Sequence, residues 1–158
     1  MVLAALILTL ATAFFFFYLQ ITCQRILRRE FDREYFLAIV NANRLEFPAV
    51  RRTLGEFNAP VDYPRLRMML KCDFLALTYL LKNAVNVHQR YSREERLLMF
   101  YFRWVFASLI ARHWLRVGEK PAILKLMAIL QYFANVVGQR VNAVRFADLT
   151  AADYVLGP

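Results

Sequence analysis

The chain opens with a long run of apolar residues that carries no charge. Val2–Leu19 is apolar except for Thr9 and Thr12, whose hydroxyls can bond back to a helix backbone, and the first charged side chain is Arg25. At a helical rise of 1.5 Å per residue, about 20 such residues span about 30 Å, the thickness of a bilayer's hydrocarbon core. The pattern predicts a transmembrane anchor over residues 1–24, with lipid-facing side chains at Val2, Leu6, Leu10, Phe14 and Phe17.

A cleaved signal peptide would have a different layout. Such a peptide has a basic segment, then an apolar run of about 7–15 residues, then a cleavage site with small residues. Here only Met1 precedes the apolar run, and the small residues at 11–13 lie inside it, ahead of four phenylalanines. We therefore expect the segment to be retained as a signal anchor.

Basic residues gather on one side of this anchor. Arg25, Arg28, Arg29 and Arg33 follow it, and no lysine or arginine precedes it. The positive-inside rule then predicts a single-pass protein with its N-terminus outside and its C-terminal part in the cytoplasm, at the inner membrane if the cell is bacterial. The same four arginines are expected to contact anionic lipid headgroups.

The segment 25–47 is predicted to continue the anchor as a helical stem. No glycine or proline occurs before Pro48, so nothing in the sequence marks a break. Apolar residues recur at spacings of three and four and would share one face: Leu27, Phe31, Tyr35, Ala38, Ala42 and Leu45. After the stem, residues 48–64 are predicted to form a short helix, from Pro48 to Gly55, and a linker.

Residues 65–145 are predicted to form a helical bundle, so the expected fold class is all-α, with three or four helices arranged as αα-hairpins. A helix over 65–88 has a leucine seam that includes Leu66, Leu70, Leu77 and Leu81. Ser92 with Glu95 three positions on is a capping box that starts the next helix, expected to run to about residue 117. Gly118 followed by Pro121 predicts a tight turn into the last helix.

The last two helices of this bundle are apolar on nearly every side, which leaves two interpretations open. Segments 97–115 and 122–138 either form the buried centre of a bundle or enter the membrane. Arg103 and Lys125 interrupt the apolar runs at a cost of about 2.5–3.5 kcal/mol each at a bilayer centre, which favours the bundle. The remaining segment, 146–158, is an acidic tail expected to fold back onto the basic bundle or to dock on a partner.

Composition supports a membrane-bound protein with a large polar-faced part. Hydrophobic residues make up 59% of the 158 residues, above the 45–50% of ordinary soluble domains, and the formal net charge is +9. This charge favours anionic lipid headgroups or acidic protein partners, and no specific nucleic-acid recognition is predicted. One small bundle cannot bury every aromatic side chain of its third helix, so a partner or membrane interface is expected at Phe100, Trp104, Phe106 and Trp114.

Candidate chemistry is sparse. His88 and His113 are the only histidines and are weak candidates for binding haem or a pigment; otherwise no cofactor, metal site or catalytic residue is predicted. Asp73 is expected to form a structural ion pair, with Arg103 as a plausible partner. Cys23 is expected to be a free thiol, with acylation at the membrane edge as the alternative.

These features together predict a membrane-anchored, non-catalytic accessory, assembly or scaffolding subunit of a larger membrane protein complex. Its partners would be other membrane-protein subunits and anionic lipid headgroups. Two alternatives are a cofactor-binding subunit of an electron-transfer or photosynthetic complex and a membrane-surface lipid-binding module. A membrane enzyme acting on lipid phosphates would need an acidic metal cluster, which the scattered carboxylates do not suggest.

Overall fold

The computed structural model describes residues 1–29, 31, 35–56, 62–83 and 91–155, with the side chains of 52–56 and 144–155 left out. The described residues form six α-helices joined by short connections, with no strand among them. The helices are α1 (Val2–Leu27), α2 (Phe36–Asn43), α3 (Phe47–Glu56), α4 (Tyr63–Asn83), α5 (Arg93–Trp114) and α6 (Lys120–Val155). The all-α class predicted from the sequence is therefore confirmed.

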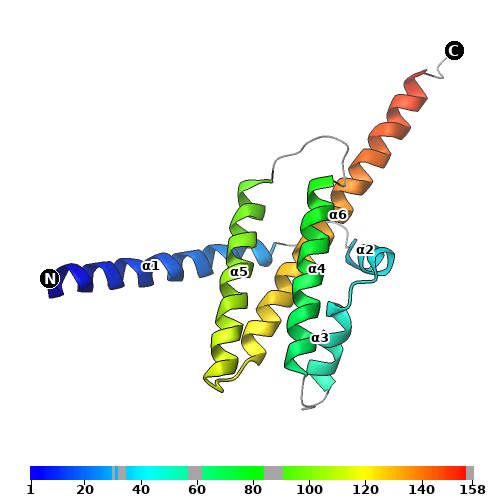
Figure 1. Cartoon of the computed structure of the whole chain (residues 1–158). Helices are drawn as coiled ribbons and strands as arrows, with labels where there is room; N and C mark the ends of the chain where they lie inside the picture. The colour runs from blue at the N-terminus through cyan, green and yellow to red at the C-terminus, as the bar shows by residue number, and fades with distance from the viewer. Residues whose placement is uncertain (30, 32–34, 57–61, 84–90, 156–158) are drawn as a thin grey trace.

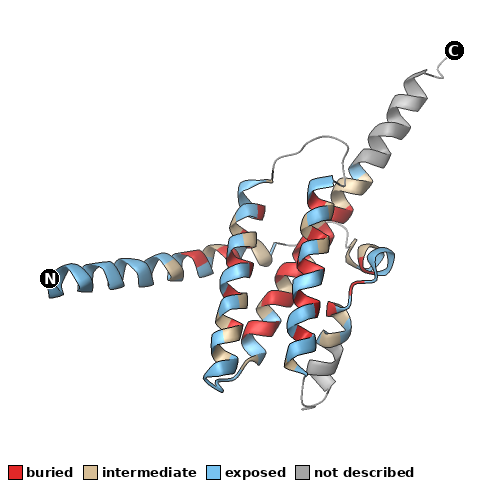
Figure 2. Ribbon diagram, in the orientation of Figure 1, coloured by how far each residue is buried: buried red, intermediate tan, exposed pale blue. Residues whose placement is uncertain are grey.

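Helix α6 is the centre of the molecule. It packs against all five other helices, and α4 and α5 lie beside it as the long members of the bundle (Figure 1). Its side chains include the most deeply buried of the structure, among them Leu126, Ile129, Leu130 and Phe133 (Figure 2). Across the bundle, Phe74 of α4 stacks on Phe102 of α5 with ring centroids 3.9 Å apart.

Among the described residues two helices are long and apolar enough to span a membrane, α1 and the part of α6 from Lys120 to Ala143. Their surroundings differ, because 67% of the apolar stretch of α6 is buried inside the protein and only 6% of that of α1 is. The long apolar pattern of α6 is therefore explained by its place in the bundle core. The apolar pattern of α1 has no such explanation within the part of the chain that the structure describes.

The leucine seam predicted for α4 is confirmed. Leu66, Leu70, Leu77 and Leu81 are all buried against the rest of the bundle. The capping box of α5 is also present: the Ser92 hydroxyl accepts a hydrogen bond from the Glu95 amide, and the Glu95 carboxylate accepts one from the Ser92 amide. These two features depend on residues close in sequence, which is why the pattern alone could locate them.

The predicted continuous stem is wrong. Helix α1 ends at Leu27, and α2 is a separate helix that packs against α6. Ala38 and Ala42, predicted to face the core, are exposed, and Val40 is buried instead. Tyr35, at the start of α2, is in close contact with α6: Gly138 lies so near it that a Cβ on the glycine would be 2.1 Å from the Tyr35 Cβ, and Asn142 donates a hydrogen bond to the Tyr35 hydroxyl at 2.6 Å.

Two boundaries also differ in detail from the sequence expectation. The left-handed residue at the α5–α6 turn is Arg116, with φ of 53°, and Gly118 does not have a positive φ. Helix α6 continues to Val155 instead of ending near residue 145, and its last part projects beyond the neighbouring helices (Figure 1). The part of α4 predicted beyond Asn83, including His88, lies outside the described residues.

Candidate functional site: the anchor helix and the outer face of α5

Helix α1 touches the bundle only through its C-terminal half. Residues 1–15 are all exposed, although they are almost entirely apolar. From Phe16 onward the helix contacts the bundle: Phe16 stacks on Trp104, and Leu19 and Cys23 are buried. The predicted lipid-facing residues Val2, Leu6, Leu10, Phe14 and Phe17 are all at least 55% exposed, so no described part of the chain covers them. Because Cys23 is completely buried, it is not available for acylation.

Helix α5 crosses α1 steeply and turns one side toward the exposed half of α1 (Figure 1). We call this side the outer face of α5. Its members are exposed and recur at spacings of three and four: Arg93, Arg96, Phe100, Arg103, Trp104, Ala107, Ala111 and Trp114. The face therefore combines three arginines with three large aromatic side chains, a composition typical of helices that lie in the interface of a membrane.

Three of the four aromatic residues predicted to form an interface lie on this face. Phe100, Trp104 and Trp114 are 50%, 45% and 88% exposed. Phe106 is the exception, because it is partly buried against the core and stacks on Phe102 with centroids 6.0 Å apart. Helical periodicity explains the difference: Phe106 is two positions from Trp104, which places it on another side of α5.

A cavity of about 540 Å³ lies in the corner between α1 and α5. Helix α1 contributes Phe15, Tyr18, Leu19 and Thr22 to its wall. Helix α5 contributes Arg93, Arg96, Leu97 and Phe100. The wall is therefore mainly apolar, with two guanidinium groups at one side. We call it the corner cavity.

The arginines that follow the anchor remain at the surface. Arg25, Arg28 and Arg29 are exposed, and Arg33 lies outside the described residues. Arg29 forms an ion pair with Glu94 of α5 at 3.5 Å, but both side chains are largely solvent-exposed. Such a pair contributes about 0–1 kcal/mol. Among the described residues Arg25 and Arg28 have no ion-pair partner.

A buried polar cluster joins the three long helices next to this region. The Glu95 carboxylate accepts a hydrogen bond from Arg140 of α6, and Arg140 also donates to the Leu81 carbonyl of α4 at 2.9 Å. Beside it, the Tyr132 hydroxyl donates to Glu94 at 3.3 Å. Burial, and then the charge of Glu94, raises the pKa of Tyr132 to about 12, so this hydroxyl keeps its proton at neutral pH. Arg140 neutralises Glu95, and the hydrogen bonds of the cluster join α4, α5 and α6.

Asp73 has a structural role, but its partner is not Arg103. Arg103 lies exposed on the outer face of α5, whereas Asp73 is buried and accepts hydrogen bonds from the amides of Glu46, at 3.2 Å, and Phe47, at 2.9 Å. A side chain of α4 thus caps the N-terminus of α3. Burial raises the pKa of Asp73 above its ordinary value, and the two amide hydrogen bonds oppose that rise.

His113 lies at the α5–α6 turn, where its partners are other side chains. Its Nδ1 is 2.6 Å from a Glu119 carboxylate oxygen, and its ring stacks on Tyr63 with centroids 3.6 Å apart. Its predicted companion, His88, lies outside the described residues. Within the described part of the chain, no three histidine, cysteine or acidic side chains gather in a way that could hold a metal ion.

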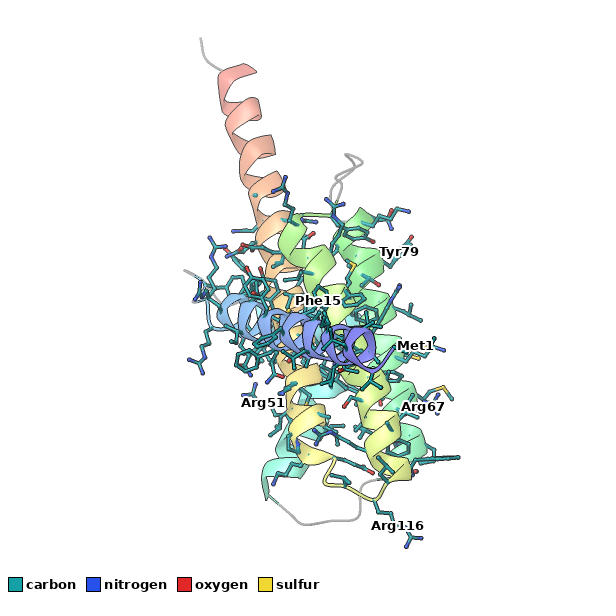
Figure 3. The ribbon with its side chains drawn as sticks, turned by 90° about the vertical axis from the view of Figure 1, so that its left-hand side faces the viewer. Met1, Phe15, Arg51, Arg67, Tyr79 and Arg116 are labelled. Carbon is teal, nitrogen blue, oxygen red and sulfur yellow. The ribbon has the colours of Figure 1, made fainter. Side chains whose placement is uncertain are left out.

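Sequence reasoning missed the surface of α4. Met68, Cys72, Leu75 and Tyr79 recur at spacings of four and three and are all exposed. Every exposed charged residue between Pro64 and Asn83 is basic, namely Arg65, Arg67, Lys71 and Lys82. Seen along α1 from its N-terminal end, Arg67 and Tyr79 lie at one side of the bundle (Figure 3). We call this surface the side face of α4. The spacing of its exposed residues is present in the sequence, but the leucine seam on the same helix is the stronger pattern.

No protein-family model matches the chain, and neither a curated protein nor a solved structure has significant similarity to it.

Proposed function

We propose that the protein is a membrane-anchored, non-catalytic accessory or scaffolding subunit of a larger membrane protein complex. In this proposal α1 crosses the membrane with its N-terminus outside, and the bundle lies against the cytoplasmic surface. The observation that carries the proposal is the exposure of residues 1–15, which are apolar and which no part of the described chain covers. Exposing such a surface to water would be strongly unfavourable.

The steep crossing of α1 and α5 supports a bundle that lies flat on the membrane. If α1 runs across the bilayer, α5 runs along its surface with the outer face toward the lipid (Figure 1). Its arginines and tryptophans then meet headgroups, where such side chains are favoured. Residues 1–15 alone would span only about 21 Å, so residues that contact α5 must also lie in the membrane to reach about 30 Å.

The side face of α4 is the surface we assign to a partner subunit. In this orientation it lies at one side of the bundle and points along the membrane plane (Figure 3). It presents Met68, Leu75 and Tyr79, each at least 55% exposed, within an entirely basic surround. A partner with an apolar patch rimmed by acidic side chains would complement it.

The anchoring half of this proposal is tested by extraction of membranes with alkaline carbonate, which releases peripheral proteins. We expect the full chain to stay in the pellet. Replacement of Leu6 and Leu10 by Asp should release it, because a charged side chain at the centre of a bilayer costs about 2.5–3.5 kcal/mol. Release of the unaltered protein would contradict the anchor.

The subunit half is tested by purification of the tagged protein in a mild detergent. We expect a partner in a fixed ratio, and we expect Leu75→Gln with Tyr79→Gln to lose it while the protein remains in the membrane. Leu124→Gln is the matched control, because Leu124 is an exposed apolar residue of α6. A stable, well-behaved monomer in detergent, with no partner lost in the α4 variant, would contradict the proposal.

The alternative of a haem- or pigment-binding subunit gains no support from a specific contact in the described residues, since His113 is engaged by Tyr63 and Glu119. An absorbance spectrum of the purified protein separates the two functions. The lipid-binding alternative is different, because a particular cavity favours it.

A further inference from the structure

The corner cavity has a polarity that matches one class of ligand. Its α1 wall is apolar, apart from the hydroxyls of Tyr18 and Thr22, and is continuous with the exposed part of the anchor. Its α5 wall carries Arg93 and Arg96, both exposed. A volume of about 540 Å³ lies within the range of pockets that hold small ligands. A ligand that fills it must offer both an apolar part and an anion.

The positive charge at this corner is not neutralised by any of the residues that the structure describes. Arg93 and Arg96 are three positions apart on one side of α5, and Arg93 is the first residue of the helix, next to the positive end of the helix dipole. The proximity of the two guanidinium groups and the place of Arg93 at the positive end of the dipole are both electrostatically unfavourable. Among the described residues neither guanidinium has an ion-paired or hydrogen-bonded partner.

The two carboxylates nearest in sequence are engaged elsewhere. Glu94 bonds to Tyr132 and pairs with Arg29, and Glu95 bonds to Arg140, all on the other side of the helix. An external phosphate would relieve the repulsion between the two arginines, because a guanidinium makes paired, charge-assisted hydrogen bonds to phosphate oxygens.

The position of the cavity along α1 selects the source of that phosphate. Residues 15–22 lie about 21–32 Å along the helix from Met1, which is where a bilayer's hydrocarbon core gives way to its headgroups. By the charge asymmetry of the anchor this is the cytoplasmic leaflet, which is rich in anionic lipid. We therefore propose that the corner cavity binds one anionic phospholipid, with its phosphate held by Arg93 and Arg96 and an acyl chain against Phe15, Tyr18 and Phe100.

This inference rests on the proposed insertion of α1, and its test separates the two. The full chain is reconstituted in nanodiscs, and its binding of phosphatidylglycerol and phosphatidylcholine is compared by native mass spectrometry after transfer to a mild detergent. We expect the unaltered protein to retain phosphatidylglycerol in preference to phosphatidylcholine. A basic residue near an anionic surface contributes a factor of roughly five, so Arg93→Gln with Arg96→Gln should raise the apparent Kd for phosphatidylglycerol by about 30-fold.

Two further variants make the result specific to this cavity. Arg116→Gln with Lys120→Gln removes the same charge from exposed positions at the α5–α6 turn and should leave the apparent Kd unchanged. Thr22→Trp fills the cavity without changing the charge and should weaken binding as the arginine variant does, which gives a second reading if the arginine variant folds poorly. Circular dichroism of each variant checks that the helical fold is intact.

Three results would overturn the proposal. Equal loss in the variant of Arg116 and Lys120 and in the variant of Arg93 and Arg96 would mean that net charge alone attracts the lipid. Equal retention of the two lipids would mean that there is no headgroup site. Displacement of phosphatidylglycerol by millimolar inorganic phosphate would mean that the arginines bind a soluble anion. In all three cases the protein stays in the carbonate-resistant membrane fraction, whereas loss from that fraction would contradict the anchor itself and the lipid site with it.

Discussion

The ring of Phe16 on α1 stacks on the indole of Trp104 on α5, with ring centroids 3.9 Å apart and planes inclined by 15°. This contact marks where the anchor leaves the bundle. The residues before Phe16 are exposed, and those after it include the buried Leu19 and Cys23. Any bilayer that holds α1 must therefore approach the outer face of α5.

Tryptophan fluorescence reports directly on that approach, because the only two tryptophans of the chain, Trp104 and Trp114, both lie on the outer face. In nanodiscs we expect a blue-shifted emission that lipids brominated on their acyl chains quench. Trp114→Phe leaves Trp104 as the single tryptophan, and Trp104→Phe leaves Trp114. Because Trp104 is next to α1, its emission should be quenched more strongly than that of Trp114. Quenching of Trp104 by aqueous iodide but not by brominated lipid would exclude the flat orientation.

Cysteine labelling tests the orientation across the membrane. Cys72 is exposed on α4, whereas Cys23 is completely buried. When the chain is expressed in excess over its partner, so that the side face of α4 is uncovered, a membrane-impermeant maleimide should therefore label Cys72 in inverted membrane vesicles and not in intact cells or spheroplasts, as the positive-inside rule requires. Cys72→Ser is the control and should abolish labelling. Labelling of intact cells would place the bundle outside.

The contact between α2 and α6 depends on the missing side chain at Gly138. A Cβ there would lie 2.1 Å from the Tyr35 Cβ and 2.9 Å from its Cγ, so Gly138→Ala must move one helix away from the other. We expect the free energy of unfolding, measured by denaturant titration in detergent, to fall by about 1–3 kcal/mol. Gly118→Ala is the matched control, because nothing lies within 4 Å of a Cβ at Gly118, and it should not destabilise the protein. Equal effects would mean that α2 does not pack as described.

The pair of Arg140 and Glu95 is buried, with side chains 17% and 4% exposed. Arg140→Met would leave the carboxylate without its cationic partner and should lower the free energy of unfolding by about 3–5 kcal/mol. Arg29→Met breaks the exposed pair with Glu94 and should cost about 1 kcal/mol or less. A small effect at Arg140 would show that water reaches Glu95, which would contradict the buried cluster.

The raised pKa of Asp73 predicts how the free energy of unfolding depends on pH. Because burial raises its pKa in the folded protein above the ordinary 3.8, the folded state binds this proton more tightly than the unfolded state does. The stability that this proton gives the folded state is fully present below pH 3.8, the ordinary pKa of the group. It is lost as the pH rises through the pKa of Asp73 in the folded protein. Asp73→Asn should therefore flatten the dependence of unfolding free energy on pH above 3.8.

At neutral pH the same position tests the cap on α3. Asp73→Ala should cost about 0.5–2 kcal/mol, because the amides of Glu46 and Phe47 lose their acceptor. Asp73→Asn keeps an oxygen for these amides and should cost less than Asp73→Ala. An alanine variant as stable as the unaltered protein would contradict the cap.

The sequence by itself determined the features that depend on near neighbours in the chain. The uncharged opening run, the leucine seam of α4 and the capping box at Ser92 each arise from spacings of three or four residues, which a helix converts directly into one face or one cap. Even for α5 the periodicity was sufficient, in hindsight, to separate Phe106 from Phe100 and Trp104.

Only the tertiary structure decided how these helices meet. The break between α1 and α2, the capping of α3 by Asp73, the pairing of Arg140 with Glu95 and the corner between α1 and α5 each join residues far apart in the chain. Local spacing carries no information on such contacts, because they depend on which surfaces bury the most apolar area once the whole chain has folded. Burial inside the bundle is also what distinguished α6 from α1, two helices that are both apolar enough to span a membrane but have opposite surroundings.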